Sequence, residues 1–111
     1  MPEHAGVRRV LAYVAANLAN PLSVARLAAE ANMSASSLTR WFRRELDITP
    51  AGYVLQARLE QARHLLQESG RSVSDVAFAC GFASAAYFST RFKQRFGCSP
   101  VAYSRRSKLS E

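Results

Sequence analysis

The chain has 111 residues and carries fifteen lysines and arginines against eight aspartates and glutamates, a formal charge of +7 at pH 7. That length suits one domain, or two very small ones sharing a core. No apolar run approaches the roughly 20 residues of a membrane span, and the N-terminus lacks the basic and apolar regions of a signal peptide, so a cytoplasmic protein without a membrane partner is expected. Excess positive charge attracts polyanions, which makes nucleic acid the expected partner, with an anionic membrane surface as the competitor.

The first half of the chain predicts three helices. The first carries apolar residues at helical spacing and ends near Asn20, because a proline follows. Ser23 caps a short second helix, and the turn after it contains Asn32, a residue that tolerates the left-handed backbone conformation. Ser34 caps a third, basic helix, so a first helix-turn-helix unit is expected over residues 20–50. The inward residues of these helices are Val7, Val10, Leu11, Val14, Leu18, Val24, Leu27, Ala28, Ala31, Leu38, Phe42 and Leu46.

A long connecting helix is predicted over residues 51–69. Thr49 caps it, Pro50 starts it and Gly70 ends it. At 1.5 Å per residue its roughly 18 residues span about 27 Å, so it can act as a rigid spacer. Its expected inward residues are Val54, Leu55, Leu59, Ala62 and Leu66, and its expected outward residues are Gln56, Glu60, Arg63 and Gln67.

A second helix-turn-helix unit is predicted over residues 70–106. Gly81 stands in the turn, where glycine best tolerates a left-handed backbone. Phe88, Phe92 and Phe96 recur at i, i+4 and i+8 and are expected to face the core. The tail beyond Ser107 is expected to fray. The predicted capping and helix-starting residues are Ser72 with Asp75 in a capping box, Ser84, Ser99 and Pro100.

The two units are copies of one pattern. Residues 38–44 recur as residues 88–94 with a shift of 50, and Thr49-Pro50 with Tyr53 recurs as Ser99-Pro100 with Tyr103. Each copy reads as a short helix, a tight turn and a basic helix, the pattern of a helix-turn-helix that reads DNA. The predicted fold is all-α: two homeodomain-like helix-turn-helix subdomains joined by a long connecting helix, with about seven helices.

The outward faces of the two basic helices hold the candidate DNA-binding residues. Residues 35–46 and 85–96 contain six of the fifteen basic residues and one acid, Glu45. An arginine can bridge O6 and N7 of guanine in the major groove, so Arg40 is the strongest base-reading candidate. Its counterpart in the second copy is Thr90, so the first copy is expected to discriminate sequence and the second mainly to anchor. The base-reading candidates are Ser36, Thr39, Arg40, Ala86, Ser89 and Thr90, and the phosphate-binding candidates are Ser37, Arg43, Arg44, Lys93, Gln94 and Arg95.

Other readings of single residues compete with these roles. Trp41 lies beside the core stripe and is expected to pack, with a base-stacking platform as the alternative. Cys80 and Cys98 are expected to be small core residues, because with His4 and His64 they form neither a metal cluster nor a disulfide framework. No nucleophile, base or metal constellation is evident, so no enzyme activity, cofactor or metal is expected. A solvated basic face without a partner remains the alternative to DNA binding.

Residues 81–100 (GFASAAYFSTRFKQRFGCSP) with Tyr103 resemble the signature of the AraC/XylS family of bacterial transcription regulators. The first half is similar to the family's first helix-turn-helix, and the resemblance covers residues 5–106. It implies an AraC-type DNA-binding domain over residues 1–111 that binds a promoter or operator in two successive major grooves, recruits RNA polymerase and usually activates transcription. It also implies a monomeric module, to which most members attach a sensing and dimerisation domain; sequence leaves open whether this chain is a fragment or a complete regulator. Many members carry arginine where this chain has Thr90. A non-specific architectural DNA-binding protein is the alternative function.

Overall fold

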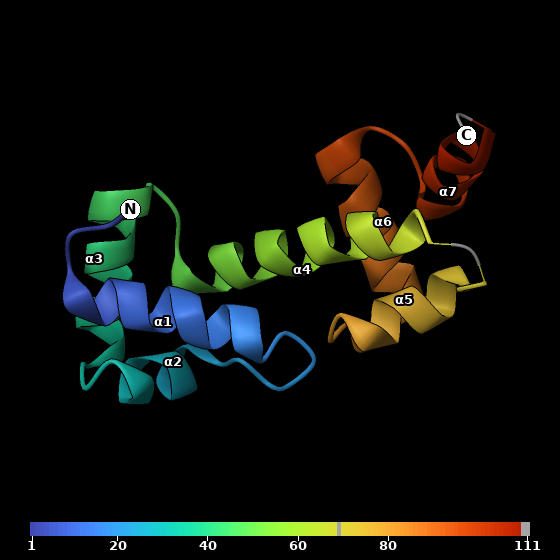
Figure 1. Ribbon diagram of the computed structural model, residues 1–111. Helices are drawn as coiled ribbons and strands as arrows, with labels where there is room; N and C mark the ends of the chain where they lie inside the picture. Colours follow the sequence, from blue (N-terminus) through green and yellow to red (C-terminus); the bar gives the residue numbers. More distant parts are fainter. Residues whose placement is uncertain (69, 110–111) are drawn as a thin grey trace. The chain divides into compact units, whose positions relative to one another are not determined.

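The computed structural model describes residues 1–68 and 70–109, without the side chains of 108 and 109. Over those residues the protein consists of seven helices and no strand, which confirms the expected all-α fold (Figure 1). It divides into two compact units, Met1–Ala57 and a second that begins at Arg58, so the boundary falls inside one helix. The helices are α1 (Ala5–Ala16), α2 (Val24–Glu30), α3 (Ala35–Leu46), α4 (Pro50–Leu66), α5 (Val73–Ala79), α6 (Ala85–Phe96) and α7 (Pro100–Leu109).

In the first unit, α1, α2 and α3 close around one apolar core. α1 packs against both of the helices that follow it, and the start of α4 adds Val54. Phe42 of α3 is fully buried and meets the ring of Tyr53 edge-on, with 5.9 Å between ring centroids. These contacts fix which side of α3 faces inward, and therefore which side remains available to a partner. The buried members of this core are Val7, Val10, Val14, Leu22, Leu27, Ala28, Ala31, Leu38, Phe42 and Val54.

The predicted end of α1 near Asn20 is wrong, because the helix ends at Ala16. Asn17 follows with a non-helical backbone, and its N–H donates to the carbonyl of Val14 at 3.1 Å. Its side-chain amide donates to the carbonyl of Tyr13 at 2.9 Å. An asparagine side chain that satisfies a late carbonyl competes with further helical turns, which is why the helix ends five positions before Pro21.

The two helix-turn-helix turns follow the same local rules, as expected. Asn32 has φ 55° and Gly81 has φ 90°, so both take the left-handed conformation. The hydroxyl of Ser34 then accepts from the N–H of Ser37 at 3.1 Å, and Ser84 accepts from Tyr87 at the same distance. Each serine satisfies one of the N–H groups that a helix start leaves unpaired, which confirms both predicted caps.

The second unit has an aromatic core. Phe88 and Phe92 of α6 are fully buried, with 5.6 Å between their centroids. Phe82 lies 4.9 Å from Phe88, and Phe96 and Tyr103 lie 4.6 and 5.7 Å from Phe92. Phe96 is half-buried at the end of the helix. The predicted inward stripe of α6 is thus confirmed, and its three rings form one cluster with Phe82 and Tyr103.

α4 begins as predicted, with the hydroxyl of Thr49 accepting from the N–H of Gly52 at 3.1 Å. It ends at Leu66, before Gly70, which has φ 88°. The expected inward face is buried except Leu55, which is half-buried. The expected outward face is only partly correct: Gln67 is exposed, whereas Gln56, Glu60 and Arg63 are half-buried.

Arg63 illustrates why the outward assignment failed. Its guanidinium donates to Glu60 at 2.7 Å and lies 5.2 Å from the ring centroid of Phe96. A long arginine side chain covers apolar surface with its stem while its charge remains paired, so helical position alone overstates its exposure. At the other end of the unit, α7 continues to Leu109. It therefore extends beyond residue 106, the predicted end of the second helix-turn-helix unit, and beyond Ser107, after which fraying is expected; residues 110–111 lie outside the described range.

The serine of the predicted capping box at α5 is confirmed. The hydroxyl of Ser72 accepts from the N–H of Asp75 at 3.0 Å. Ser99 likewise accepts from the N–H of Ala102 at 3.1 Å at the start of α7. Local sequence therefore sets the start of the helices on both sides of α6.

Candidate nucleic-acid interface

The outward face of α3 is a polar and basic surface, and the opposite face of the helix packs against the core. Leu38 and Phe42 are fully buried, while Ser36, Arg40, Arg43 and Arg44 are exposed, and Ser37 and Thr39 are half-buried. An open depression on this face is lined by Ala35, Ser36, Thr39, Arg40 and Arg43. The structure therefore brings together the base-reading candidates of the first copy and Arg43 on one accessible side. Their roles toward bases and phosphates remain predictions.

Arg40 is positioned by its own helix. Its guanidinium donates to the hydroxyl of Ser37 at 3.3 Å, one turn earlier. This long, exposed hydrogen bond contributes little stability, but it reduces the rotamer freedom of the arginine. The hydroxyl of Ser37 accepts from Arg40 and its N–H donates to the hydroxyl of Ser34, while its predicted contact with a phosphate stays a prediction.

Trp41 packs, as expected. It is half-buried against the first core, and its ring lies 4.4 Å from that of His4. The guanidinium carbon of Arg44 lies 5.2 Å from the centroid of the Trp41 ring, a cation–π geometry. The indole therefore supports an arginine of the basic face.

The outward face of α6 carries fewer charges. Ala86, Thr90, Lys93 and Gln94 are exposed and Ser89 is half-buried, so the predicted faces of the second copy are also confirmed in their exposure. The hydroxyl of Thr90 donates to the carbonyl of Ala86 at 3.1 Å. Its proton is thus engaged within the helix, leaving mainly an acceptor and a methyl group for a partner.

Arg95 does not share the face of Lys93 and Thr90. At about 100° per residue it falls on the side of Phe88. Its guanidinium lies 4.0 Å from a carboxylate oxygen of Glu60 and 6.0 Å from the centroid of the Phe96 ring. Of the predicted phosphate-binding residues of the second copy, only Lys93 and Gln94 lie with Thr90.

The DNA-binding residues predicted from the sequence do not include an aromatic–arginine pair on the flank of α6. Tyr87 is 52% exposed, and the guanidinium carbon of Arg91 lies 6.0 Å from the centroid of its ring. An aromatic residue four positions before an arginine on one helix is the sequence signal that could have found it. The pair adds a cation and a flat apolar surface beside Thr90.

The two cysteines differ, and only one matches the prediction of a core residue. Cys80 is fully buried, whereas Cys98 is half-buried. Burial raises the pKa of the Cys80 thiol to about 11, so at neutral pH it stays protonated and unreactive. We expect a thiol reagent at pH 8 to label Cys98 in the folded protein and Cys80 only after denaturant is added, as counted by mass spectrometry. Equal labelling of both thiols without denaturant would contradict this.

Among the residues described, no three His, Cys, Asp or Glu side chains lie where they could hold a metal ion together. The same part of the chain contains no helix with the length and hydropathy to cross a membrane.

A helix, a left-handed turn residue, a serine cap and an amphipathic basic helix, present twice, define a protein with two helix-turn-helix motifs. A family profile described as a helix-turn-helix domain matches residues 27–106. The chain belongs to the AraC-type helix-turn-helix family, the DNA-binding domains of transcription regulators.

Relatives and solved structures agree with that membership. The HTH-type transcriptional activator RhaS of Klebsiella pneumoniae is 36% identical over 96 residues, 86% of this chain and 34% of that protein. The regulator CdhR of Pseudomonas aeruginosa is 42% identical over 80 residues, 72% of this chain and 24% of that protein. The DNA-binding domain of AdpA, solved in complex with a target DNA, has a TM-score of 0.92 at 31% identity and covers 97% of each chain. The chain thus spans about a third or less of these two curated relatives.

Proposed function

We propose that this chain binds a specific double-stranded DNA site in a bacterial promoter or operator, with α3 and α6 entering successive major grooves. The observation that carries the proposal is the α3 face, where exposed Arg40, Arg43 and Ser36 surround an open depression on a helix fixed by buried Leu38 and Phe42. An α-helix fits the major groove, and rigid seating keeps its base-reading side chains in register. The solved complex of the AdpA domain with its target DNA supports the same partner for this chain.

The proposal extends to regulation. Because RhaS is a transcriptional activator, we infer activation through contact with RNA polymerase. The module binds as a monomer, since its two helix-turn-helix motifs supply two half-sites in one chain. The two curated relatives are longer than this chain, and if the chain is a fragment of such a regulator, we infer a separate sensing and dimerisation domain in the whole protein. Because bacterial DNA lies in the nucleoid, we infer that the protein acts in the cytoplasm, at the nucleoid.

The alternative is an architectural protein that binds DNA without sequence preference. Selection of bound sequences from a random DNA pool separates the two. A specific regulator yields a motif of roughly 20 base pairs and binds it at least about 10³-fold more tightly than random duplex at the same salt concentration. Inserting five base pairs between the half-sites rotates one by half a turn and should abolish that preference. A pool without an enriched motif would favour the architectural protein.

Lys93 tests the anchoring part of the proposal. It is exposed on α6 and is assigned to a phosphate. We expect Lys93→Ala to weaken binding to specific and random DNA alike, and to reduce the slope of log affinity against log salt by about 0.9. Fluorescence anisotropy titrations between low and moderate salt measure the slope. A change in base preference with an unchanged slope would make Lys93 a base-reading residue.

A further inference from the structure

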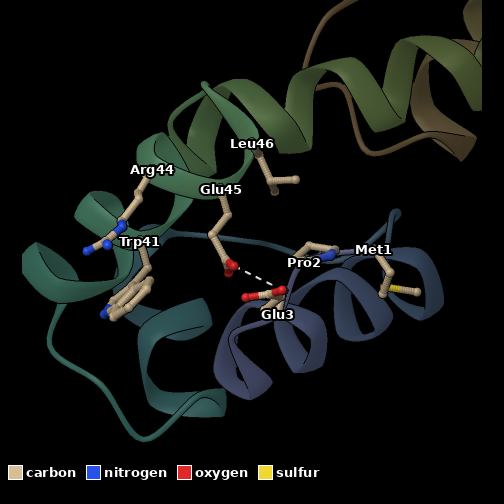
Figure 2. Close-up of a pocket in the computed structure, with 7 residues that line it drawn as sticks. All are labelled: Met1, Pro2, Glu3, Trp41, Arg44, Glu45 and Leu46. Carbon is tan, nitrogen blue, oxygen red and sulfur yellow. Dashed lines mark hydrogen bonds between the residues drawn. The ribbon is translucent and has the colours of Figure 1, made fainter.

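An N-terminal arm, Met1–His4, is fastened to the last turn of α3. The carboxylate of Glu45 accepts from the N–H of Glu3 at 2.9 Å and from the N–H of His4 at 3.0 and 3.3 Å. Arg8 of α1 holds the same arm from the other side by donating to the carbonyls of Pro2 and Glu3. Figure 2 shows Glu45 reaching toward Glu3, on the same stretch of α3 as Trp41 and Arg44.

His4 joins the arm to α1 and to Trp41. Its Nδ1 accepts from the N–H of Gly6 at 3.0 Å and of Val7 at 3.4 Å, which caps α1. The imidazole ring lies 4.4 Å from the indole of Trp41. A Cβ at Gly6 would come within 2.9 Å of Cε1 of His4, so a larger residue at this position would clash with the imidazole ring.

The contacts continue from the arm to the basic face. His4 touches Trp41, and Trp41 supports the guanidinium of Arg44 at 5.2 Å. Arg44 is exposed and is one of the residues assigned to phosphate. The arm therefore reaches a DNA-binding candidate through one intervening ring.

The second copy lacks this arrangement. At a shift of 50, Arg91 stands where the first copy has Trp41, and Arg95 stands where it has Glu45. Arg95 lies beside Glu60 of α4 instead. Glu45 is the one acid of the two basic helices, and its negative charge opposes DNA. Its carboxylate instead accepts hydrogen bonds from two N–H groups of the arm, those of Glu3 and His4.

We propose that the arm, Met1–His4, is a positioning element for the first recognition helix: through Glu45 and the His4–Trp41 contact it orders the last turn of α3 and holds Arg44 for DNA. This inference rests on the proposed function. No arm residue need touch DNA, because the effect is transmitted by Glu45 and Trp41. Preordered side chains lose less entropy on binding, so breaking the arm contacts lowers affinity.

Glu45→Ala and Glu45→Gln separate positioning from charge. Both remove one negative charge, but only glutamine keeps an oxygen that can accept from the arm. Glu30→Ala is the matched control, since it removes an acid of α2 whose ion pair is with Arg26 and not with the arm. We expect Glu45→Ala to bind the selected DNA site about fivefold more weakly than wild type, and Glu45→Gln and Glu30→Ala to bind at least as tightly as wild type. Binding of Glu45→Ala as tight as that of Glu30→Ala would overturn the proposal.

Trp41 is the single tryptophan of the chain, so its fluorescence reports on the arm without DNA. His4→Asn keeps a good N-cap for α1 and removes the ring. We expect it to shift the Trp41 emission with unchanged helicity by circular dichroism, and to weaken site binding about twofold or more. This variant carries the test if Glu45→Ala fails to fold. Shifted emission with unchanged affinity, or unshifted emission, would overturn the proposal.

Failure of the proposed function has a separate signature. If wild type shows no preference for any selected site, specific DNA binding is wrong. If wild type is specific while Glu45→Ala and His4→Asn bind like wild type, only the positioning role of the arm is wrong.

Discussion

Phe92→Ala is expected to lower the free energy of unfolding by about 3–5 kcal/mol. Phe92 is fully buried, and its ring contacts those of Phe88, Phe96 and Tyr103. Truncation leaves a cavity among rigid rings on two helices, which cannot collapse to fill it. Urea denaturation followed by circular dichroism measures the change.

Phe78→Ala is the matched control for that experiment. Phe78 belongs to the same unit, but its side chain is 56% exposed on α5. The same chemical change there is expected to cost less than about 0.5 kcal/mol, because no core cavity forms. If the two variants lost equal stability, the aromatic cluster would not be the main source of stability in the second unit.

Much of the fold could be predicted because its determinants are local. A serine three residues before a backbone N–H in the first helical turn predicts a cap, and Ser34 and Ser84 both satisfy that geometry. Asn32 and Gly81 could be placed in left-handed turns because few residues tolerate them. The i, i+4 stripe of phenylalanines likewise predicted the buried side of α6.

The errors occur where side chains compete with these local rules. The side-chain amide of Asn17 donates to a carbonyl of α1 and ends the helix early. The prediction relied instead on the proline after Asn20. Arg63 pairs with Glu60 and lies against Phe96, so a position on the polar side of α4 did not make either residue of the pair fully exposed. The burial of the Arg63 stem depends on Phe96, a neighbour distant in the sequence, and the spacing of apolar residues along α4 carries no information about that contact.

The candidate DNA-binding site also contains features that the sequence predicts and features that it does not. Helical spacing predicted the exposure of Arg40, Arg43 and Lys93, because 100° per residue fixes a face once the core side is known. Arg95 is exposed as well, but it lies beside Glu60 and Phe96 and away from Thr90, and its contact with a phosphate stays a prediction. The hydrogen bonds of Glu45 to Glu3 and His4 join residues 42 and 41 positions apart, a separation at which no sequence motif signals contact.

Substitutions at Arg40 and Thr90 test whether the first helix-turn-helix copy contributes more to base-sequence discrimination than the second. Arg40 is exposed on α3 and steadied by Ser37, while Thr90 at the equivalent place on α6 donates its hydroxyl proton to Ala86. We expect Arg40→Ala to cost about 1–3 kcal/mol of binding free energy on the selected site and to relax selection at one or two base pairs. Thr90→Ala should cost much less, because it removes a hydroxyl already satisfied within the helix.

The converse substitution strengthens the test. Thr90→Arg places a long cation at the outward position of α6, so it should tighten binding to all duplexes and add a guanine preference in the second half-site. Repeating the random-pool selection with each variant measures these changes position by position. The hypothesis is wrong if Thr90→Ala alters the selected motif as much as Arg40→Ala does. In that case α6 reads bases in its own right, and the exposed Tyr87–Arg91 pair beside Thr90 becomes the next group to substitute.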